Sequence, residues 1–188
     1  MKNIAKTDHE INPILSSRWS PRAFDSSKAI NDKDINSLFE AARWAPSAFN
    51  AQPWNFVYGK KGDENFDKIY NVMMEGNQVW AKNASLLILV SGNSMHNGKE
   101  NPTYLYDCGS ATAHLSVEAS SRGIDVHQMT GFFADKASEV FNLAEDVKPI
   151  TIIAAGYGTN PDILPEYLAK REVAPRVRKK QEEFVNKF

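Results

Sequence analysis

Hydrophobic and polar positions follow two alternating periodicities along most of the chain. Apolar residues recur at helical spacing over residues 31–45, 63–74, 103–122 and 135–143. Short alternating or continuous apolar runs, typical of strands, occupy residues 54–58, 84–91, 123–129 and 148–155. The runs at 84–91 and 148–155 lack polar alternation, so we expect both strands to be buried on both faces.

The helix predicted at 103–122 is the longest, and Gly123 behind it is a natural C-terminal cap. Its composition is unusual because much of it is small: Gly109, Ser110, Ala111, Thr112, Ala113, Ser116, Ala119, Ser120 and Ser121. Small side chains allow another backbone or a flat ligand to approach closely. This helix is therefore a candidate contact surface.

After Gly158 the chain becomes polar and charged, and Pro161, Pro165 and Pro175 interrupt any regular pattern. The last thirty residues contain no apolar strand or long helical pattern. We expect residues 159–188 to form an extended arm that wraps a surface, including that of a partner. No linker divides the chain, so residues 1–188 are expected to form a single domain.

Composition excludes several classes of function. Of the 188 residues, 42% are hydrophobic, and 22 basic against 23 acidic residues leave a net charge of −1. No global field therefore favours nucleic acid or an acidic membrane. The single cysteine, Cys108, fits a reducing compartment, and no apolar run is long enough for a signal peptide or a membrane span. We expect a cytoplasmic protein.

Two short segments carry the candidate chemistry. The first, residues 18–24, places Arg18, Ser20 and Arg22 within five positions, a donor set suited to a phosphate. A solvated basic turn is the alternative. The second, residues 46–54, brings polar side chains into a proline-bracketed loop that can contact the edge of a flat polar ring; the alternative is a tight turn anchored by a tryptophan. The basic residues at 176–180 are candidates for phosphate binding only if they lie beside the first segment and reach the same phosphate.

Other chemistry has little support in the sequence. Residues 156–161 imitate the start of a dinucleotide-binding fingerprint, but Pro161 stands where the third glycine belongs. The four histidines show no metal-binding spacing, so no metal is expected. No Gly-x-Ser-x-Gly nucleophile elbow is present either, so the sequence shows no motif of a hydrolytic active site.

Taken together, the segments Arg18-x-Ser20-x-Arg22-x-Phe24 and 45–54 resemble the nitroreductase family of FMN-dependent oxidoreductases. The likeness extends over roughly 160 residues in chain order. It includes the strand at 87–90, the small-residue helix at 107–123, the Met129–Phe132 segment, the strand at 150–157 and the basic residues at 175–179.

That resemblance implies a nitroreductase-like α+β fold with a mixed, mainly antiparallel sheet flanked by helices, and a C-terminal arm that embraces the partner subunit. It also implies a homodimer with two FMN sites at the subunit interface. The flavin phosphate would be held by Arg18, Ser20, Arg22, Arg176 and Arg178. The ring would be contacted by Pro46, Ser47, Ala48, Asn50 and Gln52 of the other subunit, and by Met129, Thr130 and Gly131.

Two positions depart from the family pattern. Many members carry arginine where this chain has Trp19, so we expect the contacts to the phosphate to differ from those of the family. The position of Phe49 is often small in the family, so we expect this ring to narrow the substrate pocket.

The activity implied is reduction of nitroaromatic, quinone, enone or similar electrophilic acceptors by ping-pong hydride transfer, with NADH or NADPH as donor and no catalytic side chain beyond the flavin. A non-catalytic flavin-binding sensor or carrier, and an anion-binding module without flavin, are the alternatives. Flavin colour and its bleaching by NAD(P)H would separate the three.

Overall fold

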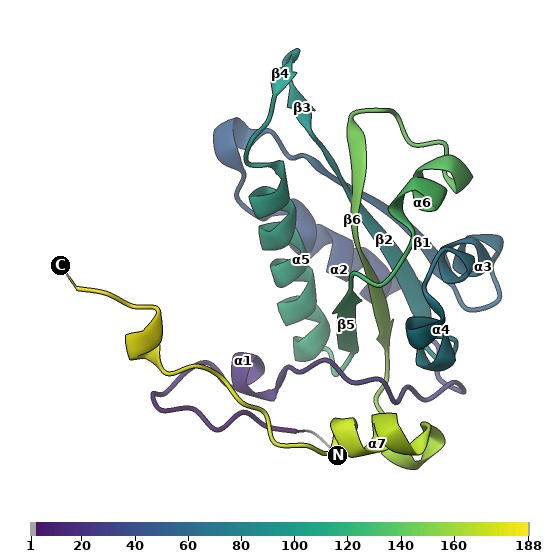
Figure 1. Ribbon diagram of the computed structural model, residues 1–188, viewed down its shortest axis with the longest axis vertical. Coiled ribbons are helices and arrows are strands. Elements are labelled where there is room, and N and C mark those ends of the chain that lie inside the picture. Colours follow the sequence, from purple (N-terminus) through teal and green to yellow (C-terminus); the bar gives the residue numbers. More distant parts are fainter. Residues whose placement is uncertain (1–2, 188) are drawn as a thin grey trace.

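The computed structural model describes residues 3–187 as helices packed on an antiparallel sheet (Figure 1). Its helices are α1 (Pro13–Ser17), α2 (Asp32–Arg43), α3 (Glu64–Asn71), α4 (Glu75–Ala81), α5 (Tyr104–Ser121), α6 (Ala134–Val140) and α7 (Glu166–Glu172). Its strands are β1 (Trp54–Lys60), β2 (Leu86–Asn93), β3 (Met95–His96), β4 (Lys99–Glu100), β5 (Asp125–Met129) and β6 (Val147–Gly156). Each helix and strand predicted from the sequence is present, and the α+β class is confirmed.

The main sheet has the strand order β1-β2-β6-β5. Every neighbouring pair in it is antiparallel, with a bulge between Val90 and Ser91 where β2 meets β6. The two central strands are the apolar runs of the sequence, and β2 is buried from Leu86 through Gly92. The expectation of strands covered on both faces is therefore confirmed for β2 and for the C-terminal half of β6.

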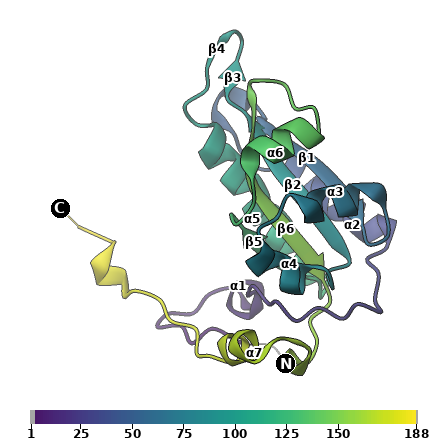
Figure 2. The ribbon, with the colours of Figure 1, turned by 45° about the vertical axis from the view of Figure 1, so that its right-hand side comes forward.

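Two cores explain that burial, because successive side chains of a strand point to opposite faces. Leu87 and Leu89 join a core that includes Ile69 of α3 and Trp80 of α4. Leu86, Ile88 and Val90 join a second core with side chains from α2 and α5. Figure 2 shows α3, α4 and α6 on one side of the sheet, with α2 and α5 behind it.

Helix α5 runs the length of the sheet and divides into two faces. Its buried face includes Ala111, Leu115 and Ala119, which pack in the second core. Its first turn exposes Leu105 and Tyr106 to solvent. The helix ends at Ser121, and Gly123 adopts a φ of 72°, as expected of a glycine that follows a helix.

The C-terminal region contains a packed part and an extended part. Leu164 and Leu168 are buried in the first core, so η2 (Pro161–Ile163) and α7 belong to the body of the protein. Beyond Glu172 the chain leaves the body as an extended arm with one short turn, η3 (Gln181–Glu183), and it projects away from the sheet (Figures 1 and 2). The last residue of the predicted arm lies outside the described residues.

No helix within residues 3–187 is long and apolar enough to cross a membrane.

Candidate functional site

Three arginine side chains converge where the arm passes α1. Arg18 is the C-cap of α1, whereas Arg176 and Arg178 lie on the arm. Burial, followed by the positive charge of Arg178, lowers the pKa of the Arg18 guanidinium. Burial and then the charges of the other two lower the pKa of Arg176. Within residues 3–187 none of the three has a carboxylate at ion-pair distance. The cluster is an uncompensated positive site, suited to an anion.

Backbone carbonyl groups hold this cluster together. The Nη1 of Arg176 donates hydrogen bonds to the carbonyl oxygens of Asn3, at 2.9 Å, and Ser16, at 3.0 Å. The side-chain amide of Asn3 in turn donates to the carbonyl of Ala174 at 3.0 Å. The arm is thus tied to α1 and to the N-terminal segment, and this keeps like charges close.

Arg22 has a different environment from the other arginines. Its Nη1 lies 3.7 Å from Oε2 of Glu172, which is buried. Oε1 of the same carboxylate accepts the backbone N–H groups of Arg22, at 2.6 Å, and Ala23, at 3.0 Å. Glu172 therefore fixes the backbone of the first predicted segment and offsets the charge of one arginine in it.

His127 of β5 supports the same segment from the other side. Its Nδ1 lies 3.0 Å from the carbonyl oxygen of Pro21, and its ring centroid lies 4.6 Å from that of Trp80. Burial, and then the positive charge of Arg22, lower the pKa of the His127 imidazole to about 4. The ring is neutral at pH 7, and its Nδ1–H donates to the carbonyl. Ser20, which stands between Arg18 and Arg22 in the sequence, is exposed to solvent.

The predicted ring-contacting segment follows directly after β5. Met129 and Thr130 line a cavity of about 290 Å³ together with Gly109 and Thr112 from the small-residue face of α5. Cys108 lines it as well, and burial raises the pKa of this thiol to about 12, so it stays protonated at neutral pH. The cavity explains why this part of α5 is built from small residues.

Gly131 is held by a residue that the sequence reasoning missed. The Asn77 side-chain amide donates to the carbonyl of Gly131 at 3.0 Å, and the backbone N–H of Met74 donates to the same oxygen at 2.9 Å. A Cβ at Gly131 would lie 2.5 Å from Nδ2 of Asn77, so any larger residue would displace this amide. The sequence pointed to this role of Asn77 only in that a polar residue follows Gly76.

The second predicted segment, residues 46–54, is a strained loop with its tip in solvent. Phe49, Asn50 and Gln52 have positive φ values of 52°, 55° and 47°. The Ser47 hydroxyl accepts the backbone N–H of Gln52 at 3.0 Å. The side chain of Phe49 is exposed, at 95% relative accessibility, and Pro46 is exposed too. The loop presents its side chains outward rather than into the body of its own chain.

A buried carboxylate in α5 anchors this loop. Oδ2 of Asp107 accepts the backbone N–H of Ala48 at 3.2 Å and the Thr103 hydroxyl at 3.1 Å. Asp107 is 2% exposed, and neither the composition of α5 nor its periodicity pointed to this contact.

The two predicted segments do not meet within the chain. The loop is anchored at the first turn of α5 through Asp107, whereas α1 and Arg18 lie beside the opposite end of that helix (Figure 1). An 18-residue helix is about 27 Å long. Met129 and Thr130 line a cavity with Leu105 and Cys108, which are close to Asp107 in α5, so the ring segment lies toward the loop end of the helix and the arginines toward its other end.

We expect Asp107→Leu to release the loop, because the backbone N–H of Ala48 would lose its acceptor. Amide hydrogen exchange should become roughly tenfold faster or more over residues 47–52. Asp107→Asn is the control, since its carbonyl oxygen can still accept both donors. Unchanged exchange in the leucine variant would show that Asp107 does not hold the loop.

The lowered pKa of His127 predicts acid sensitivity. Because the unfolded imidazole, with a pKa near 6.5, takes up a proton before the folded one does, stability is full above that pH and falls as the pH decreases toward 4. From pH 7 to pH 5 this single group should remove about 2 kcal/mol from the free energy of unfolding.

Urea unfolding at pH 7 and pH 5 measures this effect. In the His127→Gln variant the free energy of unfolding should fall less between the two pH values than in the wild-type protein, because the histidine contribution is absent. The matched control is His114→Gln, which changes an exposed histidine. Equal pH dependence in the wild-type protein and His127→Gln would contradict a buried neutral imidazole.

Comparison with known proteins gives the family. The model of the nitroreductase family matches residues 15–85. A solved structure described as an oxidoreductase containing FMN is 36% identical, covers 100% of this chain and 99% of its own, and superposes with a TM-score of 0.89. A 15.4 kDa protein of Mycolicibacterium smegmatis is 32% identical, with 65% of this chain and 88% of that protein covered.

The oxygen-insensitive NADPH nitroreductase of Helicobacter pylori is 32% identical over 77 residues, which are 41% of this chain and 36% of that enzyme. The matched region of the family model contains both predicted segments, from Arg18 to Trp54. The chain therefore belongs to the nitroreductase family.

Proposed function

We propose that this protein is an NAD(P)H-dependent FMN oxidoreductase that reduces small electrophilic molecules. The observation that carries the proposal is the cluster of Arg18, Arg176 and Arg178, which has no carboxylate counterion within the described residues. A cofactor phosphate supplies the missing negative charge and accepts the donors of planar guanidinium groups. The 36% identical structure that contains FMN supports this choice of anion.

The predicted site residues also fit the separate parts of a flavin nucleotide, its phosphate and its ring. Arg18, Arg176, Arg178 and Ser20 would bind the phosphate, with Arg22, whose charge Glu172 offsets, as a further hydrogen-bond donor. Met129, Thr130 and Gly131 would lie against the ring, and the 290 Å³ cavity lined by Met129 and Thr130 leaves room for a flat group.

The loop of residues 46–52 would reach the flavin from a second copy of the chain. Its outward-facing side chains and its distance from the arginine cluster favour a partner's site over its own. Trp44, Phe49, Leu105 and Tyr106 are large apolar side chains exposed near the same end of α5, and burying them gives a homodimer its driving force. The arm would embrace the partner.

When bound, FMN supplies the hydride chemistry, and the protein binds, orients and tunes it. The side-chain amides of Asn50 and Gln52 are donors suited to the polar edge of the ring, where they would stabilise negative charge. Cys108 stays protonated, so it is not a nucleophile. No side chain of the site needs to act as a general acid or base.

The proposed acceptors are nitroaromatics, quinones, enones and similar electrophiles, reduced in a ping-pong scheme with NADH or NADPH as the first substrate. Exposed Phe49 would form a wall of the substrate pocket. The free, buried Cys108 is consistent with the cytoplasm, where we place the protein.

Arg178→Glu tests the phosphate site. The side chain is exposed, so folding should survive, and reversal of its charge should weaken FMN binding roughly 100-fold or more. Lys179→Glu makes the same charge change one residue further along the arm and should retain the flavin. Flavin absorbance of the purified proteins, before and after anaerobic NAD(P)H, measures both binding and reduction. Equal flavin retention in the two variants, or colourless wild-type protein, would overturn the proposal.

Subunit mixing tests the shared site. Arg178→Glu damages the phosphate half of a site, and Asn50→Asp, which keeps the tolerance of positive φ, places a charge in the loop half. If each site combines halves from two chains, refolding the inactive variants together at equal amounts should restore about a quarter of the sites. A site contained within one chain would give no recovery.

A further inference from the structure

One peptide group, between Pro21 and Arg22, is held at both ends by side chains from distant elements. Its carbonyl oxygen lies 3.0 Å from Nδ1 of His127, and its N–H donates to Oε1 of Glu172 at 2.6 Å. The next N–H along the chain, that of Ala23, donates to the same carboxylate oxygen at 3.0 Å. Side chains of β5 and α7 therefore fix the backbone in the middle of the predicted phosphate-binding segment.

Aromatic packing fixes the direction in which His127 donates. Its ring centroid lies 4.6 Å from that of Trp80, and the Trp80 ring stacks on Phe24 with centroids 6.2 Å apart. The imidazole is neutral at pH 7, because burial and the charge of Arg22 lower its pKa to about 4. Its Nδ1–H therefore holds the Pro21 carbonyl without adding charge to the arginine cluster.

His127 also connects the phosphate end of the predicted site with its ring end. It lies two residues before Met129 in β5, a distance of about 7 Å along a strand. Met129 and Thr130 line the 290 Å³ cavity beside α5. Strand β5 is paired along its length with the central strand β6, so its residues keep their spacing. The bond from His127 to Pro21 therefore sets how far the arginine segment lies from the ring segment.

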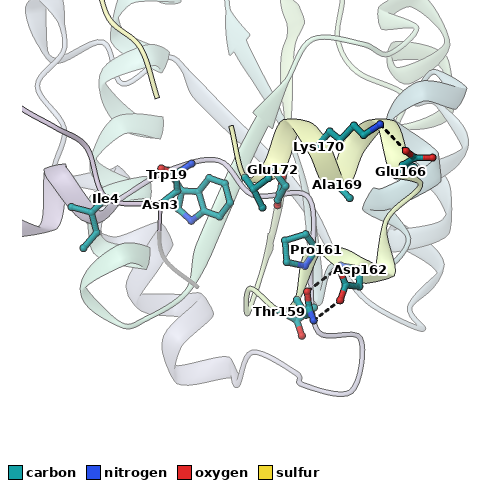
Figure 3. Close-up of a pocket in the computed structure, with 12 residues that line it drawn as sticks. Asn3, Ile4, Trp19, Thr159, Pro161, Asp162, Glu166, Ala169, Lys170 and Glu172 are labelled. Atoms are coloured by element: carbon teal, nitrogen blue, oxygen red, sulfur yellow. Dashed lines mark hydrogen bonds and ion pairs between the residues drawn. The ribbon is translucent and has the colours of Figure 1, made fainter. Parts of the chain in front are cut away.

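Glu172 links the two halves of the arginine cluster. It ends α7 and lies beside the chain that carries Trp19, whereas Arg176 and Arg178 follow it on the arm (Figure 3). Because its Oε1 holds the N–H groups of residues 22 and 23, the start of the arm has a fixed place relative to the first segment. Its buried Oε2 lies 3.7 Å from Nη1 of Arg22 and accepts no hydrogen bond within residues 3–187. The carboxylate thus offsets one cation of a site that needs cations, and positioning is what it contributes.

We propose that His127 and Glu172 are positioning residues for the flavin phosphate, and that through the Pro21–Arg22 peptide they make the protein select FMN over riboflavin. The inference rests on the proposed function. FMN reaches the arginines and the ring segment at once, so its phosphate adds affinity only when the two subsites lie at the matching separation. Riboflavin has the same ring and ribityl chain without the phosphate, and its binding does not depend on that separation.

Flavin exchange in the full-length protein tests the proposal. The purified protein is equilibrated with mixtures of FMN and riboflavin, and the ratio of the two flavins that it retains gives the preference. General damage to the ring site cancels in this ratio. We expect the wild-type protein to prefer FMN by about 100-fold or more. His127→Leu removes the donor to Pro21 and should lower the preference roughly tenfold. His127→Asn, whose amide places a donor near the position of Nδ1, should restore most of it.

A second pair of variants keeps the test open if His127→Leu does not fold. Glu172→Leu removes the acceptor of two backbone N–H groups and should also lower the preference roughly tenfold. Glu172→Gln keeps an acceptor oxygen and removes the negative charge beside Arg22, so its preference for FMN should at least equal that of the wild-type protein. His114→Leu is the matched control, because it exchanges an exposed histidine of α5 and should leave the ratio unchanged.

An unchanged ratio in the two leucine variants would overturn the inference. A preference that is lost in His127→Leu and not restored in His127→Asn would also overturn it, because the hydrogen bond to Pro21 would then not be the cause. Wild-type protein that retains neither flavin would instead overturn the proposed function itself, so the two failures are distinguishable.

Discussion

The like charges of Arg18, Arg176 and Arg178 are the constraint on which the candidate site depends. Guanidinium groups repel one another and lose solvation when they are partly buried, as the lowered pKa values of Arg18 and Arg176 indicate. The fold keeps them close through neutral carbonyl oxygens, not through carboxylates. Carbonyl groups satisfy donors without cancelling charge, so the positive potential remains available to an anion.

Glu172 shows why one carboxylate near this cluster does not neutralise it. Its Oε1 is occupied by two backbone amides, and its Oε2 lies 3.7 Å from Nη1 of Arg22. The carboxylate thus sets the backbone path of residues 22 and 23, and within residues 3–187 it leaves the other three arginines without a carboxylate at ion-pair distance. Because Glu172 ends α7, the same contact also fixes where the arm begins, and hence where Arg176 and Arg178 lie. Backbone geometry and charge placement are coupled through one side chain.

The elements that the sequence predicted correctly are those with long, uniform patterns. The continuous apolar runs of β2 and β6 and the periodicity of α2 and α5 report burial directly. Helices α1, α4 and α7 have five to seven residues, too few for a 3.6-residue period to be recognised.

The supporting contacts of the site were beyond prediction for a different reason. Glu172 and Arg22 are 150 positions apart, and Asp107 and Ala48 are 59 apart. Such contacts depend on how elements pack in space, and no local pattern records them. The phosphate-binding and ring-binding assignments came instead from residue chemistry and family resemblance, and they remain predictions. The structure adds the cause of their arrangement, since α5 separates the loop from the arginines by its length.

The loop of residues 46–54 shows how local strain follows from that separation. Phe49, Asn50 and Gln52 occupy the left-handed region without the freedom of glycine, which is unfavourable in an isolated turn. Two contacts offset this cost: the Ser47 hydroxyl bonds Gln52, and buried Asp107 bonds Ala48. The left-handed backbone turns the side chains outward, so that Phe49 is almost fully exposed. In the proposed shared site, this strain is the condition for presenting the polar groups and the aromatic ring of the loop to a second subunit.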